Sequence, residues 1–171
     1  MKKIIALIMA MLLALSASAL AATYTSDDIN FDYDDSALEI TQEEHKDDDD
    51  TVILGFMNKA WGDGYIRIRF QEIPDEGEAY PTWEEIAENL GTTTDKMENL
   101  PTWGNYTDVI TTSLETGNIT ETVFIAPVFD DDNHADMLTI TIGTAKLEDE
   151  DAAIARDDAI SQVVDTLKVI D

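Results

Sequence analysis

Cysteine is absent from this chain of 171 residues. Its absence excludes disulfide bonds, thiolate metal ligands and cysteine nucleophiles, so the stability of the fold has to come from the packing of its core. It also excludes a lipoprotein anchor, because the lipid of such an anchor is attached to a thiol.

Basic residues are scarce, with 10 lysines and arginines against 37 acidic residues and a formal net charge of −27. A surface with this charge repels phosphate backbones and anionic lipid headgroups, which excludes nucleic acid as a partner. The charge favours cations, basic partners or simple solubility.

Catalytic motifs are missing as well. The two histidines, His45 and His134, each lie beside acidic residues, and the chain has no nucleophile elbow, zinc-protease motif or glycine-rich phosphate loop. We therefore expect a non-enzymatic protein. The alternative is a small hydrolase that works with two carboxylates, a chemistry that an acid-rich chain always permits.

The N-terminus has the features of a secretory signal peptide. Two lysines precede an apolar run from Ile4 to Leu15, and small residues follow it as far as Ala22. The pattern predicts a signal peptide over residues 1–22, cleaved after Ala19, Ala21 or Ala22. The apolar run is shorter than the roughly 20 residues that span a bilayer, so we expect no membrane span after cleavage.

Cleavage would leave 37 acidic against 8 basic residues, a formal charge of −29, because two of the ten basic residues belong to the signal. The remaining chain, residues 23–171, has the length of one ordinary domain. We expect a single domain, exported to the periplasm or the extracellular space.

Alternating apolar residues predict several strands. The clearest pair forms a hairpin over residues 119–142, with an acidic turn between its strands. Alternation also predicts an opening hairpin over residues 29–40, a second hairpin over 51–73 and a strand over 106–113. The acidic run at 45–50 is expected to be a solvated loop or turn.

Three stretches are predicted to form helices. Thr82 and Glu85 have the spacing of a capping box at the start of a helix that Gly91 would end, and residues 94–100 are expected to form a further short helix. The longest helix is expected over residues 149–170, with apolar side chains on one side. We expect this side to form one core with the late hairpin, through Leu138, Ile140, Ile142, Val163, Val164 and Leu167.

The order of these elements predicts the α+β class: an antiparallel β-sheet built from hairpins, packed by a long C-terminal helix and one or two short helices. The same order resembles the PsbP-like family, through the early strand with Phe31 and Tyr33 and the later stretches TWEEIAENL, ETVFIAPVF, MLTITIG and AISQVVDTLKVI. The likeness covers most of residues 29–170. It implies an antiparallel sheet sandwiched by helices, as in the extrinsic photosystem II subunits of that family. It matches no motif position by position, so it assigns no functional residue.

Arg67 and Arg69 are candidate ligand-binding residues. They alternate with Ile66, Ile68 and Phe70, so they should project from the same face of a strand. They can either pair with acidic neighbours on that sheet face or bind the carboxylate or sulfate of a ligand. Three tryptophans near turns allow two roles as well, contact with a partner or carbohydrate, or packing at the edge of the core: Trp61, Trp83 and Trp103.

The acidic turn of the late hairpin contains the candidate metal ligands Asp130, Asp132 and Asp136. Calcium binds six to eight oxygens, but the turn lacks the glycine and the distal glutamate of an EF-hand. A solvated turn is therefore the leading interpretation, and we expect no cofactor, with Ca²⁺ as the alternative. The sequence predicts an exported domain that binds or assists another exported or cell-surface component, which it does not identify. The other alternative is a calcium-stabilised secreted domain.

Overall fold

The structure is a computed structural model that describes residues 21–73, 80–129 and 135–170. Strands contain 55% of the described residues and helices only 22%, and all the strand pairs are antiparallel. The antiparallel pairing is confirmed. The predicted class, α+β with one sheet and a long C-terminal helix, is wrong: the protein is mostly β, it has two sheets, and its C-terminal helix is short.

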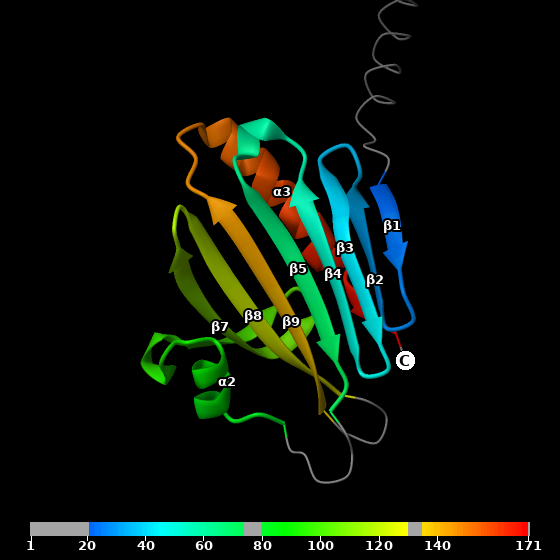
Figure 1. Ribbon diagram of the computed structural model, residues 1–171, viewed down its shortest axis with the longest axis vertical. Helices are drawn as coiled ribbons and strands as arrows, with labels where there is room; N and C mark the ends of the chain where they lie inside the picture. The colour runs from blue at the N-terminus through cyan, green and yellow to red at the C-terminus, as the bar shows by residue number, and fades with distance from the viewer. Residues whose placement is uncertain (1–20, 74–79, 130–134, 171) are drawn as a thin grey trace, which may run out of the picture.

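The larger sheet has seven strands and is the centre of the molecule (Figure 1). In the order in which they pair across the sheet, the strands are β3 (Leu38–Lys46), β4 (Asp49–Phe56), β5 (Gly64–Gln71), β9 (Ala135–Ala145), β8 (Ile119–Phe129), β7 (Tyr106–Thr116) and β6 (Glu98–Trp103). The predicted late hairpin is confirmed as β8 and β9, and the predicted hairpin over 51–73 as β4 and β5.

The smaller sheet joins the two ends of the described chain. Strand β2 (Ile29–Asp34) lies between β1 (Ala21–Thr25) and β10 (Lys168–Val169). The backbone N–H of Ile170 donates to the carbonyl of Asp28 at 2.7 Å, which extends this pairing by one bond. The small sheet and helix α3 (Glu150–Thr166) cover one face of the large sheet, which we call the inner face.

The alternation along the strands explains the two faces of the large sheet. Register places Ile66 opposite Ile142 and Ile68 opposite Ile140, so the apolar residues of β5 and β9 meet on the inner face. One cluster of buried residues joins this face to α3 and to the small sheet. The core predicted from the sequence is confirmed: Leu138, Ile140, Val163, Val164 and Leu167 are buried in it, and Ile142 packs against it.

A second, smaller cluster lies on the opposite face of the sheet, which we call the outer face. Helix α2 (Trp83–Asn89) covers part of it and buries Ile86 against β7 and β8. The predicted capping box is confirmed, since Thr82 accepts from the backbone N–H of Glu85 and the Glu85 carboxylate accepts from that of Thr82. Gly91 follows the helix with φ +66°, a conformation that favours glycine.

Three local predictions are wrong. The strands of the expected opening hairpin form as β2 and β3, but they pair in different sheets. Residues 94–100 form only one 3-10 turn, η2 (Thr94–Lys96), before β6 begins. The C-terminal helix ends at Thr166, because the residues after it pair with β2 as β10, so no basic residue lies in its last turn.

The acidic run at 45–50 forms the predicted turn only at residues 47 and 48. It includes the end of β3 and the start of β4, and a second 3-10 turn, η1 (Lys59–Trp61), joins β4 to β5. Across the described ranges 21–73, 80–129 and 135–170, no helix combines the length and the apolar character needed to cross a bilayer.

Candidate functional site

A slot of about 440 Å³ lies between α3 and the inner face of the large sheet. We call it the α3 slot. Its walls come from strands β8 and β9, from the end of β6 and from one side of α3. This volume is within the range of pockets that bind small molecules, roughly 300–1,000 Å³.

The floor of the slot contains an aromatic pair. The rings of Trp103 and Phe124 are parallel to within 2°, with their centroids 3.7 Å apart. Apolar side chains of Ile142, Ile160 and Val164 complete this surface. Because Phe124 covers one face of the Trp103 indole, only the other face can receive a ligand.

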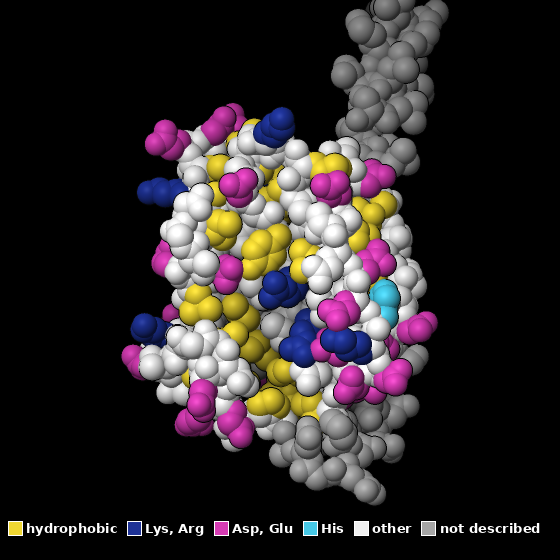
Figure 2. All heavy atoms as spheres, in the orientation of Figure 1, with side chains coloured by type: hydrophobic (Ala, Val, Ile, Leu, Met, Phe, Trp, Pro, Cys, Tyr) yellow, Lys and Arg dark blue, Asp and Glu magenta, His cyan; other side chains and the backbone are white. Residues whose placement is uncertain are grey.

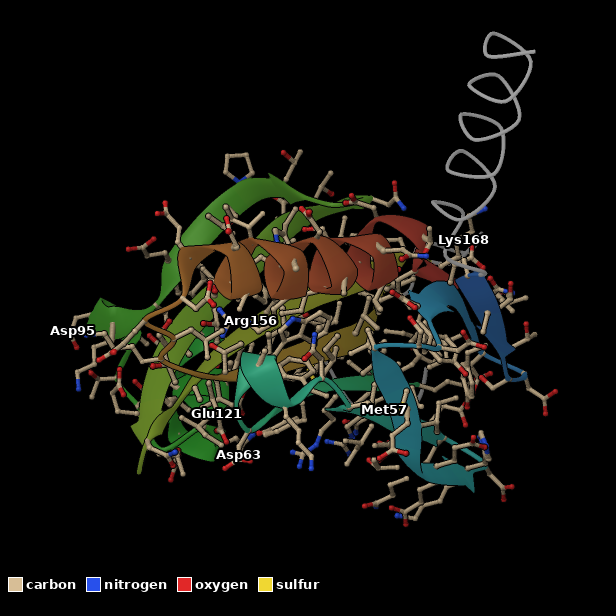
Figure 3. The ribbon with its side chains drawn as sticks, turned by 90° about the horizontal axis from the view of Figure 1, so that it is seen from above. Met57, Asp63, Asp95, Glu121, Arg156 and Lys168 are labelled. Atoms are coloured by element: carbon tan, nitrogen blue, oxygen red, sulfur yellow. The ribbon has the colours of Figure 1, made fainter. Side chains whose placement is uncertain are left out.

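Arg156 is the one basic residue of the slot, and it is only 9% exposed. It lies on the side of α3 that faces the strands (Figure 3). Its Nη1 donates to the carbonyl of Ala145 at 2.9 Å, and its Nε donates to the Asp157 carboxylate at 3.1 Å. Its Nη2 forms no hydrogen bond to any residue that the structure describes. A buried guanidinium with free donors can bind a ligand oxygen.

Hydrogen bonds near both ends of α3 join the helix to the large sheet. At one end, Arg156 ties the helix to Ala145 at the end of β9. At the other, the Asn105 amide donates to the carbonyl of Asp165 at 3.1 Å, and the Tyr106 hydroxyl donates to that of Leu167 at 3.3 Å. These hydrogen bonds join the helix to the end of β9 and to the turn between β6 and β7, on either side of the slot.

Sequence reasoning missed this site, although one signal was present. Arg156 interrupts the apolar side of the predicted C-terminal helix between Ala153 and Ile160, at the spacing of one helical turn. A charged residue at such a position is buried only with partners, so it indicates a special role. Of the three tryptophans, Trp61 is buried in the core, Trp83 is exposed on α2 and Trp103 lines the slot.

The structure places Arg67 and Arg69 on the same, outer face of β5, as the alternation predicts. Figure 2 shows basic side chains in the middle of this face, with acidic side chains toward its edges. Arg69 donates from Nε to Asp49 at 3.0 Å and from Nη2 to the same carboxylate. This hydrogen bond from Arg69 lowers the pKa of Asp49. Arg69 thus has the acidic partner that the sheet-pairing interpretation predicts.

Arg67 has a different environment. Its guanidinium carbon lies 5.7 Å from the ring centre of Tyr65, and it forms no ion pair within the described part of the chain. The Tyr65 hydroxyl donates to Glu121 at 2.7 Å, and burial raises the pKa of Tyr65 to about 12. Gly143 makes room for this ring, since a Cβ there would lie 2.6 Å from it. The two arginines therefore have separate partners.

Of the three candidate metal ligands, only Asp136 lies in a described segment; Asp130 and Asp132 lie outside the described residues. The Asp136 carboxylate accepts from the backbone N–H of Ile73 at 2.9 Å, which joins the ends of β5 and β9. Within ranges 21–73, 80–129 and 135–170, no group of three or more potential ligand side chains is arranged to hold a metal ion.

Salt is expected to raise the melting temperature, and calcium is expected to raise it no more than magnesium does. The reason is that ions screen the repulsion within a chain of this charge, with a Debye length of about 10 Å at 0.1 M salt. Thermal melts in NaCl, MgCl₂ and CaCl₂ at equal ionic strength test this. A rise specific to calcium that disappears in the Asp130→Asn/Asp132→Asn variant would contradict it and establish a calcium site.

The end of the β3–β4 hairpin contains a buried acid. Asp50 is 3% exposed, and its Oδ1 lies 2.7 Å from Nδ1 of His45, whose side chain is half exposed. Its other oxygen has no hydrogen-bond partner among the described residues. The hydrogen bond that the His45 ring donates to Asp50 raises the pKa of His45 above its usual 6.5, and the Glu43 carboxylate, 3.7 Å from Nε2, acts in the same direction.

The pKa of His45 is expected to fall back toward 6.5 in the variant Asp50→Asn, as measured by NMR titration of its ring protons. Because the pKa is raised in the folded state, the pair stabilises the protein fully below about pH 6.5, and this contribution is lost as the pH rises through the folded pKa. Glu43→Gln is expected to cause a smaller change. An unchanged His45 pKa in Asp50→Asn would contradict the assignment.

No family model, curated protein or solved structure matches the chain. The resemblance to the PsbP-like family is therefore still a prediction.

Proposed function

We propose that the protein is an exported, non-enzymatic domain that binds another exported or cell-surface component, and that it binds this component in the α3 slot. The observation that carries the proposal is the slot itself, a concave site with an aromatic floor and a buried arginine that keeps free donors. Binding sites combine apolar surface with a few oriented polar groups in this way.

Export is supported by the lysines, the apolar run and the small residues of the N-terminal segment. Strand β1 begins at Ala21, which pairs with Asp34, so cleavage after Ala19 would leave the strand whole. N-terminal sequencing of the secreted or periplasmic protein is expected to find a start between Leu20 and Thr23. A start at Met1 would overturn this part of the proposal.

Binding is preferred over hydrolysis because of the position of the carboxylates in the slot. A general acid in a two-carboxylate hydrolase needs a pKa raised by burial in the cleft. Asp157 and Asp165 are both exposed, at the rim of the slot on α3. Carboxylates in this position can accept hydrogen bonds from a ligand, but they lack the burial that a general acid needs.

A bulky side chain in the slot provides the test. Ser161 is exposed on α3 and lines the slot, whereas Ala155 is exposed on the same helix and does not line it. Ser161→Trp is expected to abolish retention of the purified mature protein on the envelope fraction of its source organism, and Ala155→Trp is expected to leave retention unchanged. Circular dichroism melts establish that both variants fold. Equal retention of the two variants would refute binding in the slot.

A further inference from the structure

We infer that the ligand of the α3 slot is a neutral carbohydrate, bound as a short stretch of an oligosaccharide. This inference rests on the proposed function, because it names the ligand class of the same site. A pyranose ring has C–H groups on its faces and hydroxyl groups around its edge. A site for it therefore needs a flat apolar surface surrounded by hydrogen-bonding groups of both kinds.

Trp103 provides the flat surface. Phe124 stacks on one face of the indole at 3.7 Å, and Trp103 is only partly buried and lines the slot, so its indole is an aromatic platform there. Aromatic side chains give a large contact area at a small cost in conformational entropy, since they have only two rotatable bonds. The C–H face of a sugar ring can pack on this platform.

The polar groups of the slot include both donors and acceptors. Arg156 offers the donors of Nη2, and carboxylates and hydroxyls offer acceptors, the hydroxyls being donors as well. A sugar hydroxyl both donates and accepts, so it can pair with every one of these groups, and its bonds to charged groups are the stronger ones. The acceptors are Asp157, Asp165, Thr122, Thr144 and Ser161.

The charges in and around the slot favour a neutral carbohydrate over an anionic or a cationic ligand. An organic anion would meet Arg156, but the charge of this residue is balanced by Asp157 at 3.1 Å, and Asp165 adds a second carboxylate. The field of a chain with a net charge of −27 opposes an anion further. A cation would be attracted by this field, yet it would leave the donors of Arg156 without acceptors. A neutral polyol avoids both conflicts.

The test is a titration of the mature protein, without its signal peptide, with neutral oligosaccharides of glucose, mannose, galactose and N-acetylglucosamine. Binding is monitored by tryptophan fluorescence and calorimetry. An anilinonaphthalene sulfonate dye and tyramine serve as the anionic and cationic probes. At least one oligosaccharide is expected to bind and to change the fluorescence. Trp103→Ala is expected to weaken this binding at least about tenfold, and Asp165→Asn is expected to weaken it as well.

Trp83→Ala is the matched control, since Trp83 is exposed on α2 at the opposite face of the sheet, and it is expected to bind as the unchanged protein does. Sugar binding that is equal in Trp103→Ala would overturn the assignment to the slot. If no oligosaccharide binds, the carbohydrate inference is wrong. The proposed function survives that result if Ser161→Trp still abolishes retention on the envelope, and fails with it if retention is unaffected.

Discussion

Leu167→Ala is expected to lower the free energy of unfolding by about 2–5 kcal/mol, the range found when a large buried side chain is cut back and leaves a cavity. Leu167 has no exposed surface, and it lies at the point where α3 passes into β10. Its backbone N–H donates to the carbonyl of Val163 at 3.0 Å. Ile140→Ala should have an effect of the same size from the sheet side of this core, where Ile140 is 2% exposed.

Ile154→Ala is the control for Leu167, because Ile154 lies on the same helix with 54% of its surface exposed. Its effect should stay within about 0.5 kcal/mol, as is usual at exposed positions. Urea denaturation followed by circular dichroism measures all three variants. Losses below about 0.5 kcal/mol at both Leu167 and Ile140 would show that the helix does not pack against the sheet.

Phe31→Ala is expected to cost about 3–5 kcal/mol, the range for truncation of a large buried aromatic side chain. Phe31 is fully buried at the centre of the small sheet, and its ring stacks on that of Tyr24 with centroids 5.0 Å apart. It belongs to the same cluster as the apolar residues of the large sheet. The variant therefore tests whether the two sheets share one core.

Urea denaturation measures the loss of stability in Phe31→Ala. Phe129→Ala is the control, since Phe129 is 54% exposed at the end of β8. A single cooperative transition shifted to lower urea is the expected result for Phe31→Ala. A separate early transition, with the rest of the protein unchanged in stability, would instead show that the small sheet unfolds on its own.

The sequence pattern predicted where the strands lie in the chain better than it predicted which strands pair. Alternation identifies which residues of a strand face the core, and it did so for β5 and β9. It carries no information on the strand that lies alongside. Ile29, Phe31 and Leu38 are all buried as expected, but the turn between them leads the chain from one sheet to the other. Such a change of sheet has no signature in the spacing of apolar residues.

The candidate sites also differ in how far the sequence could predict them. Arg67 and Arg69 are neighbours in sequence, so their common face could be predicted from the period of a strand. The α3 slot joins Trp103, Phe124 and Arg156, which come from three elements far apart in the chain. Only the curvature of the sheet and the position of α3 bring them together. A local pattern cannot predict that arrangement.

The pairing of β10 with β2 also determines the order in which the protein can fold. Val169 lies opposite Ile29, so the small sheet closes a loop of about 140 residues. A chain made from its N-terminus cannot form this sheet until residue 169 has been synthesised, and contacts of such long range form slowly. Until then β2 can pair only with β1, and it lacks both β10 and the helix α3 that packs against it. The small sheet is consequently incomplete until synthesis of the chain is almost finished, which is compatible with the export proposed from the N-terminal segment.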